Sequence, residues 1–442
     1  MYLSAMIRIF LKNYFILLFL FLLVRQGDAQ DISYAHKVVD TLAAPGMHGR
    51  GYVEEGDKIA SLYLRNEFRR LGLKPFNNRY FQEFNISVNT FPGTLKFSIG
   101  KEKITLVPGK DFLIEGNSPS LLYDATKLVW FDSAIVTSVK KTKKFLRKKF
   151  PDKILVIDAK GVLDKNQLEL VQAARQNPFG AKALLIFNNK KLTWSVGHEP
   201  ASYPSFELLV PDTLNALWRK RLTAVSMEIE SKFIPNYTTQ NVIGFLEGSQ
   251  YPDSFIVFAA HYDHLGMMGR DACFPGANDN ASGCAMLLNL AQHYSKPENK
   301  PKYSIAFIAF GAEEAGLLGS NYYVEHPLFP LKKIKFLLNM DIMGTGDEGI
   351  TVVNATLHKQ EFDTLVAINK RKNYLTQVKP RGKTQNSDHY FFSEKGVKTF
   401  FIYTMGGIKA YHDIYDRRET LPLTKFEDVF KLIKDFTGYL SK

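Results

Sequence analysis

The run Val257-Phe258-Ala259-Ala260-His261-Tyr262-Asp263 constrains the fold more than any other stretch of the chain. Its four apolar residues predict a buried strand that ends in a His-x-Asp pair. Open α/β sheets bind their ligands at the carboxyl ends of strands, so this strand delivers an imidazole and a carboxylate to a place where a site is expected. The pair alone is a weak signal, and it gains weight because acidic residues and another His follow later apolar runs.

From Gln240 onward, short apolar runs alternate with segments of helical periodicity. Strands are predicted at 241–246, 255–260, 303–310, 335–340, 350–353 and 397–403, and helices at 281–294, 315–325, 359–372 and 424–440. Such alternation is typical of an α/β fold with a mixed, mainly parallel sheet covered by helices on both faces.

The rest of the chain divides by its pattern. Residues 30–99 contain a helical segment that ends at Gly72, preceded by the Gly-rich run 46–51, which favours a turn over a lip above a distant site. Residues 100–235 carry a strand–helix–strand pattern with no clustered His, Asp or Glu. We therefore expect an inserted, smaller α/β domain at 100–235 and a catalytic domain made of residues 236–442 together with 30–99.

The first 29 residues resemble a secretory signal. Arg8 and Lys12 precede the apolar stretch 14–24, and Gly27-Asp28-Ala29 supplies small residues for cleavage after Ala29. A membrane anchor is the alternative, but the apolar stretch is short for a span. The sequence thus predicts an exported protein, periplasmic or secreted, whose mature chain has no membrane span.

The net charge and the two cysteines exclude few classes of protein. The formal net charge is +13, and much of the excess lies between Lys140 and Lys149. No aromatic residues interleave there to stack bases, so a solvated helix face is favoured over a nucleic-acid surface. Cys273 and Cys284 could form one disulfide in an exported protein, but Cys284 lies in an apolar helical run, which favours unpaired thiols.

Further polar residues follow the predicted strands. Asp279 lies in a turn before a helix, Glu313 and Glu314 follow the strand that ends at 310, Asp341 ends the next strand, and His412 lies in a late loop. Singly, each carboxylate is best explained as a helix cap or a surface charge. Jointly, side chains placed after successive strands of one sheet converge on one rim.

These residue types suit a site for two metal ions. Two His and three carboxylates are ligands that Zn²⁺ prefers, and an Asp can bridge two ions through its two oxygens. Two ions can activate one water, and one carboxylate must then stay free to take its proton. The neighbours Glu313 and Glu314 allow that division, and Asp263 can accept the ring N–H of His261.

The chain at this point resembles the M28 family of zinc metallopeptidases, the co-catalytic aminopeptidases. The resemblance is dense over residues 240–442 and looser over 31–99. Six motifs carry it, in family order: Ala260-His261-Tyr262-Asp263-His264-Leu265-Gly266, residues 275–283 around Asp279, residues 310–320 around Glu313-Glu314, Asn339-Met340-Asp341-Ile342-Met343-Gly344, Ser387-Asp388-His389 and Tyr411-His412.

The resemblance implies a three-layer phosphorylase/hydrolase-like zinc exopeptidase fold with two Zn²⁺ per chain. His261 and Asp341 would bind one zinc, Glu314 and His412 the other, and Asp279 would bridge them. Glu313 would be the general base and then the general acid. These assignments follow from the positions in the motifs.

The resemblance also implies finer features. Asp263 would orient His261, Tyr411 would contact the substrate or simply pack its ring, and the bond Asp279–Asn280 would be cis. The insert resembles a protease-associated domain, which would restrict access to the cleft or serve as a structural lid without substrate contact.

The expected function is that of an exported aminopeptidase acting on peptides. A carboxypeptidase or dipeptidase of the same family is an alternative, with Arg270 or Arg381 as candidate clamps for a substrate carboxylate. A glutaminyl cyclase, which would bind one zinc, and a non-catalytic binding domain that has lost its ions are the others. The full set of five ligands favours hydrolysis.

Overall fold

The computed structural model describes residues 32–442. The predicted signal segment lies outside the described residues. Within them, no helix combines the length and apolarity needed to cross a membrane.

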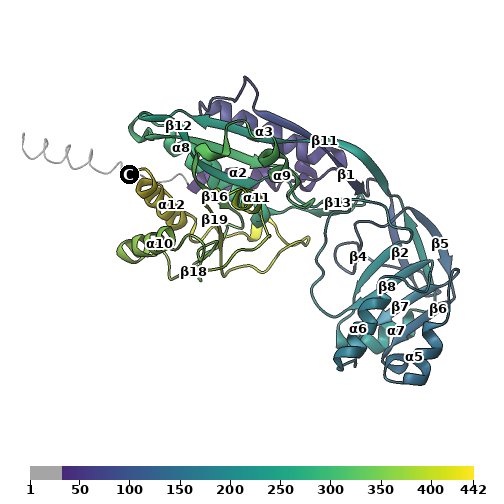
Figure 1. Cartoon of the computed structure of the whole chain (residues 1–442). Helices are drawn as coiled ribbons and strands as arrows, with labels where there is room; N and C mark the ends of the chain where they lie inside the picture. Colours follow the sequence, from purple (N-terminus) through teal and green to yellow (C-terminus); the bar gives the residue numbers. More distant parts are fainter. Residues whose placement is uncertain (1–31) are drawn as a thin grey trace, which may run out of the picture.

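An eight-stranded mixed sheet forms the centre of the larger lobe (Figure 1). Its strands are, in spatial order, β1 (Phe81–Thr90), β11 (Lys232–Leu246), β15 (Tyr303–Phe310), β12 (Tyr251–His261), β16 (Ile334–Met340), β19 (Thr399–Thr404), β17 (Ile350–Val353) and β18 (Val378–Pro380). The neighbours β15, β12, β16 and β19 are parallel, whereas β11 and β17 each pair antiparallel with their neighbours in this group. The predicted mixed sheet is confirmed.

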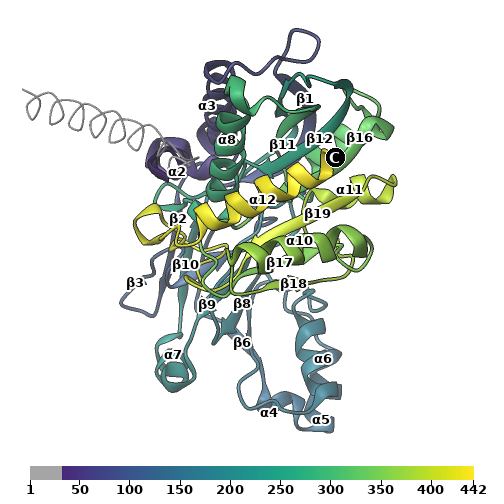
Figure 2. The ribbon, with the colours of Figure 1, turned by 90° about the vertical axis from the view of Figure 1, so that its left-hand side faces the viewer.

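Helices cover both faces of this sheet, which makes three layers (Figure 2). In β12, Ile256, Phe258 and Ala260 pack on one face and Val257 and Ala259 on the other, as the two-residue period of a strand requires. The first face is covered by α2 (Ile32–Leu42), α3 (Gly56–Arg70), α8 (Ser282–Tyr294), α10 (Lys359–Lys372) and α12 (Phe426–Leu440), and the second by α9 (Leu318–Glu325) and α11 (His389–Glu394).

A smaller lobe is inserted between β1 and β11 (Figure 1). One sheet contains β3 (Ile104–Thr105), β2 (Leu95–Ile99), β10 (Val225–Ile229) and β5 (Leu121–Ala125), and the other contains β4 (Phe112–Ile114), β9 (Ser205–Leu209), β8 (Ala183–Asn188), β7 (Ile154–Asp158) and β6 (Leu128–Asp132). Helices α4 (Ser133–Val136), α5 (Val139–Leu146), α6 (Lys165–Ala174) and α7 (Asn215–Arg221) complete it. Strand β2 starts five residues before the predicted insert because it pairs with β10.

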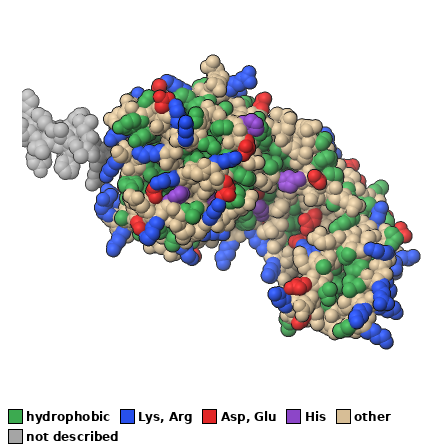
Figure 3. All heavy atoms as spheres, in the orientation of Figure 1, with side chains coloured by type: hydrophobic (Ala, Val, Ile, Leu, Met, Phe, Trp, Pro, Cys, Tyr) green, Lys and Arg blue, Asp and Glu red, His purple; other side chains and the backbone are tan. Residues whose placement is uncertain are grey.

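The basic cluster lies on α5 and the residues after it, at the outer end of the smaller lobe (Figures 1 and 3). Helix α5 buries Thr142 and Phe145 and exposes its four lysines. This is the solvated helix face that the sequence predicts.

Candidate metal centre

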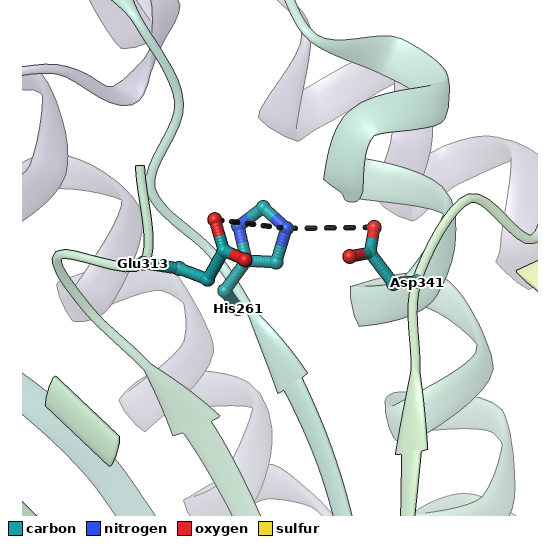
Figure 4. Close-up of side chains that lie close together, drawn as sticks. All are labelled: His261, Glu313 and Asp341. Carbon is teal, nitrogen blue, oxygen red and sulfur yellow. Dashed lines mark ion pairs between the residues drawn. The ribbon is translucent and has the colours of Figure 1, made fainter. Parts of the chain in front are cut away.

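The predicted site residues come together at the carboxyl edge of the parallel strands. His261 is the last residue of β12, Asp341 directly follows β16, and Glu313 lies three residues beyond β15 (Figure 4). Asp279 precedes α8, and His412 lies in the loop after β19. Residues more than 150 positions apart in the sequence thus form one cluster, because parallel strands end at the same edge.

One group of donors surrounds His261. Its Nε2 atom lies 3.4 Å from Asp279 Oδ1 and 3.4 Å from Asp341 Oδ1. In tetrahedral zinc sites the bonds to nitrogen and oxygen are roughly 2.0–2.1 Å, which places neighbouring donors about 3.3 Å apart. Both distances from His261 therefore match the spacing between neighbouring ligands of one zinc ion.

A second group surrounds His412. Its Nε2 atom lies 3.3 Å from Asp279 Oδ2 and 3.1 Å from Glu314 Oε2. Asp279 thus offers a different oxygen to each histidine. This is the arrangement that a bridging carboxylate between two metal ions needs.

The charges in this cluster also fit metal ions. Asp263, Asp279 and Asp341 are buried, and Glu313 and Glu314 are nearly so. Even the three imidazoles of His261, His264 and His412 cannot balance five carboxylates, and unpaired buried charges are costly. Bound divalent cations would neutralise this excess, so the donor set fits the predicted ions.

The pKa values report the same crowding. Burial lowers the pKa of His412, but Glu314 and Asp279 outweigh it and raise this pKa to about 11. Burial and the neighbouring Asp279 raise the pKa of Glu314, whereas His412 and His264 outweigh them and hold it at about 2. His412 and Glu314 therefore each stabilise the charged form of the other.

Glu313 differs from the two groups of donors. Its Oε2 atom lies 4.0 Å from His261 Nε2, outside the close contacts that the other carboxylates make (Figure 4). Burial, together with the carboxylate of Glu314, raises its pKa well above the ordinary value. A carboxyl group that favours its protonated form beside the site suits a group that takes up and returns a proton.

Asp263 contacts the site in a way that the sequence did not predict. Its carboxylate lies 3.8 Å from His261 Nδ1, whereas its backbone oxygen lies 3.2 Å from that nitrogen. The carboxylate instead accepts the backbone N–H groups of Glu313 and Glu314, at 3.1 and 3.2 Å. The expected ring N–H bond to the carboxylate is absent, and Asp263 joins the loops after β12 and β15. Its role in orienting His261 stays a prediction.

The loop that carries Asp279 is held by hydrogen bonds to its backbone N–H groups. The peptide bond Asp279–Asn280 is cis, as the resemblance implies. The Asp416 carboxylate accepts the N–H groups of Asn278 and Asp279, at 2.8 and 2.9 Å. Asp416 was not singled out from the sequence, where a lone Asp in a late loop has no distinguishing feature.

Arg50 is the most important residue that the sequence did not reveal. It is fully buried, and its guanidinium donates to the backbone oxygens of Leu42, Tyr262, Pro275, Gly276 and Asp279. The Gly-rich run that contains it forms a short 3₁₀ helix packed against the site loops. The interpretation as a simple turn therefore understated this segment, and the Gly spacing that allows the close packing was the available signal.

Three other side chains support the ligands. His264 is buried, and its Nδ1 lies 2.7 Å from Glu314 Oε1. The Ser387 hydroxyl donates to Asp341 Oδ2 at 3.2 Å. The Tyr411 ring stacks on the His412 ring with centroids 4.0 Å apart, so it packs on a ligand, and its substrate contact stays a prediction.

The cysteines are not joined. Cys273 is partly buried and Cys284 is buried, and both are free thiols, as predicted. The Cys284 thiol donates to the backbone oxygen of His261 at 3.2 Å. It therefore packs beneath the ligand-bearing strand.

Part of the chain is similar in sequence to known peptidases. Residues 241–437 match the family described as Peptidase family M28. The chain is 34% identical over 202 residues to aminopeptidase YwaD of Bacillus subtilis (strain 168), which covers 43% of this chain and 41% of that protein. It is 36% identical over 116 residues to a probable zinc metalloprotease of Pyrenophora teres f. teres, which covers 25% of this chain and 24% of that protein. The matches thus span less than half the length of these curated relatives.

Solved structures match along nearly the whole chain. The zinc aminopeptidase BSAP from Bacillus subtilis aligns with a TM-score of 0.68 at 21% identity, covering 94% of this chain and 95% of that one. A peptidase M28 precursor from Shewanella amazonensis SB2B aligns with a TM-score of 0.70 at 20% identity, covering 93% and 94%. At these identities the likeness establishes the fold, including both lobes. Residues 241–437, which hold every predicted metal ligand, are the part of the chain that matches peptidase family M28.

Proposed function

We propose that this protein is an exported exopeptidase with two zinc ions, an aminopeptidase that releases residues from the amino terminus of peptides. The observation that carries the proposal is the pair of donor groups that share Asp279, with Glu313 beside them. YwaD and BSAP, to which the chain is similar, are named aminopeptidases. The match of residues 241–437 to peptidase family M28 supports peptide hydrolysis by this site.

The proposed ligands are His261 and Asp341 for one ion, Glu314 and His412 for the other, and Asp279 for both. Zinc ions bound there would act as Lewis acids that polarise the scissile carbonyl and lower the pKa of water. Glu313 takes the proton from the attacking water and returns it to the amine that leaves. Asp263 holds the backbone of Glu313, which keeps that carboxylate facing the site.

A cavity of about 390 Å³ adjoins Asp279 and can receive a substrate side chain. Ile342, Ile408 and Tyr411 line it, together with Thr345 and Tyr403. Glu348 and Lys409 also line it, so the cavity offers both apolar and charged groups beside the proposed metal ions.

The decisive experiment compares free and N-blocked aminoacyl and peptide substrates. An aminopeptidase cleaves the free forms, and blocking the amine abolishes cleavage. Cleavage of N-blocked peptides from their carboxyl end would favour the carboxypeptidase, and one bound ion per chain by elemental analysis would favour the cyclase. The absence of hydrolysis with zinc or cobalt present would support a binding domain.

Glu313→Gln tests the proton transfer. General acid–base catalysis contributes about 10²–10⁴-fold, so kcat should fall by that factor while the zinc content stays at the wild-type value. Full activity in a zinc-replete variant would refute the role.

Export and the domain division rest on the sequence. We propose that residues 1–29 direct export and that residues 100–235 form a protease-associated-like insert between the two parts of a catalytic domain, 30–99 and 236–442. Fractionation of cells that express the full chain tests the first point, since a cytoplasmic product with an intact amino terminus would contradict it.

A further inference from the structure

The insert contacts the backbone on both sides of a proposed metal ligand. The connection between β8 and β9 of the insert carries Trp194 beside the loop of His412. The backbone N–H of Trp194 donates to the backbone oxygen of His412 at 2.9 Å. In return, His412 Nδ1 lies 3.0 Å from the backbone oxygen of Trp194.

The second of these bonds fixes the chemistry of the imidazole. A backbone oxygen only accepts hydrogen bonds, so Nδ1 must carry a proton, and in the neutral imidazole that binds a metal ion Nε2 then presents its lone pair. Nε2 is the atom that faces Asp279 and Glu314. The insert therefore holds His412 in the tautomer and orientation that a metal ligand requires.

Lys191 of the insert bonds to the same loop. Its ammonium group donates to the backbone oxygens of Lys409 and Tyr411, at 2.8 and 2.9 Å, and lies 2.6 Å from Asp413 Oδ2. Asp413 is buried, whereas the Lys191 side chain is 40% exposed. One cation of the insert thus binds the chain on both sides of His412.

His412 needs such support, because its φ is 52°. This left-handed conformation is uncommon for residues other than glycine and persists where surrounding contacts hold it. Trp194 and Lys191, both in the insert, bond to the backbone oxygens of His412 and of its neighbour Tyr411.

Trp194 is itself anchored. Its side chain is buried, its indole N–H donates to the backbone oxygen of Ile114 at 2.7 Å, and its ring stacks on Phe274 with centroids 4.8 Å apart. Phe274 ends β14 (Ala272–Phe274), five residues before Asp279. The same insert residue therefore contacts the approaches to two proposed ligands.

We propose that the insert is a structural part of the metal centre, in which Trp194 and Lys191 are positioning residues for His412. This goes beyond a role as a lid over the cleft, and it rests on the proposed function of His412 as a zinc ligand. The ion held by His412 and Glu314 should then depend on the insert, while the ion held by His261 and Asp341 should not.

Zinc titration of the metal-free full chain against a competing chelator tests this. Lys191→Met removes the ammonium group and keeps the stem, and Lys190→Met is the matched control, since Lys190 is exposed and its side chain makes no hydrogen bond or ion pair within residues 32–442. Loss of a group that orients a ligand weakens metal binding by about 10–100-fold. We expect one binding step of Lys191→Met to weaken by about 10-fold, the other step to stay, and the control to match the wild type.

The double variant Lys191→Met/His412→Ala separates positioning from a general effect. Once His412 is absent, Lys191→Met should shift no remaining zinc-binding step. A shift that persists in the double variant, or a Lys191→Met titration identical to the wild type, would overturn the inference while the wild type still binds two ions. A wild type that binds fewer than two ions would overturn both this inference and the proposed function.

Discussion

Replacement of Arg50 by Lys is the most informative perturbation of the scaffold beneath the site. Arg50 donates to five backbone oxygens from its buried position. A lysine has three donors, so at least two of these oxygens lose the Arg50 donor, and at least one becomes unpaired because, within residues 32–442, only Gly276 keeps another partner, the N–H of Ala281. Each unpaired buried acceptor costs about 1–3 kcal/mol, and the expected destabilisation of the site loops is therefore about 1–3 kcal/mol for the one acceptor that must lose its partner.

Hydrogen exchange of the metal-free protein measures this locally. The N–H groups of Asn278 and Asp279 are bonded to Asp416 and report on opening of the loop. A loss of about 2 kcal/mol corresponds to roughly 30-fold faster exchange. Arg69→Lys is the matched control, because Arg69 is exposed at the end of α3. Exchange of segment 276–281 at the wild-type rate in Arg50→Lys would refute the account of the buried guanidinium.

Three further predictions concern other buried groups. Burial lowers the pKa of His389 to about 3; because an unfolded His takes up its proton near pH 6.5, stability should fall as the pH drops from about 6.5 to 3, by up to about 1.4 kcal/mol per pH unit from this residue. Urea unfolding between pH 7 and 4 should show a shallower fall in His389→Gln, and an unchanged slope would contradict this. His264→Gln removes the contact to Glu314 Oε1 and should weaken one zinc-binding step by about 10–100-fold; equal titrations would exclude a role in orienting Glu314. Cys284 is buried and should react with a thiol reagent only on unfolding, and rapid labelling of that residue in the native protein would disagree with its position beneath β12.

The sequence alone identified six of the eight strands of the central sheet from their apolar runs, and it missed β1 and β18. The predicted strand 303–310 coincides with β15, and 350–353 coincides with β17. Helix 359–372 likewise matches α10. These elements are readable because periodicity is local, so each segment carries its own pattern of burial.

The ligand residues were predictable for a related reason. Acidic and His side chains directly after apolar strands are conspicuous, and the topology of parallel strands brings them to one edge. The sequence could not predict how Asp263 contributes, because its position two residues past His261 suggested a bond to the ring. In the structure its carboxylate accepts hydrogen bonds from two backbone N–H groups of another loop.

What the sequence by itself determined is the α/β fold, the edge at which the site lies and the residue types that meet there. Only the tertiary structure decided how those residues are held: Arg50 from the amino-terminal segment, Asp416 from a late loop, and Lys191 with Trp194 from the insert. Each of these residues binds mainly backbone oxygens or N–H groups. Every residue type except proline offers the same backbone donor and acceptor, so such partners leave no pattern in the sequence, and the folded chain alone shows which of them meet.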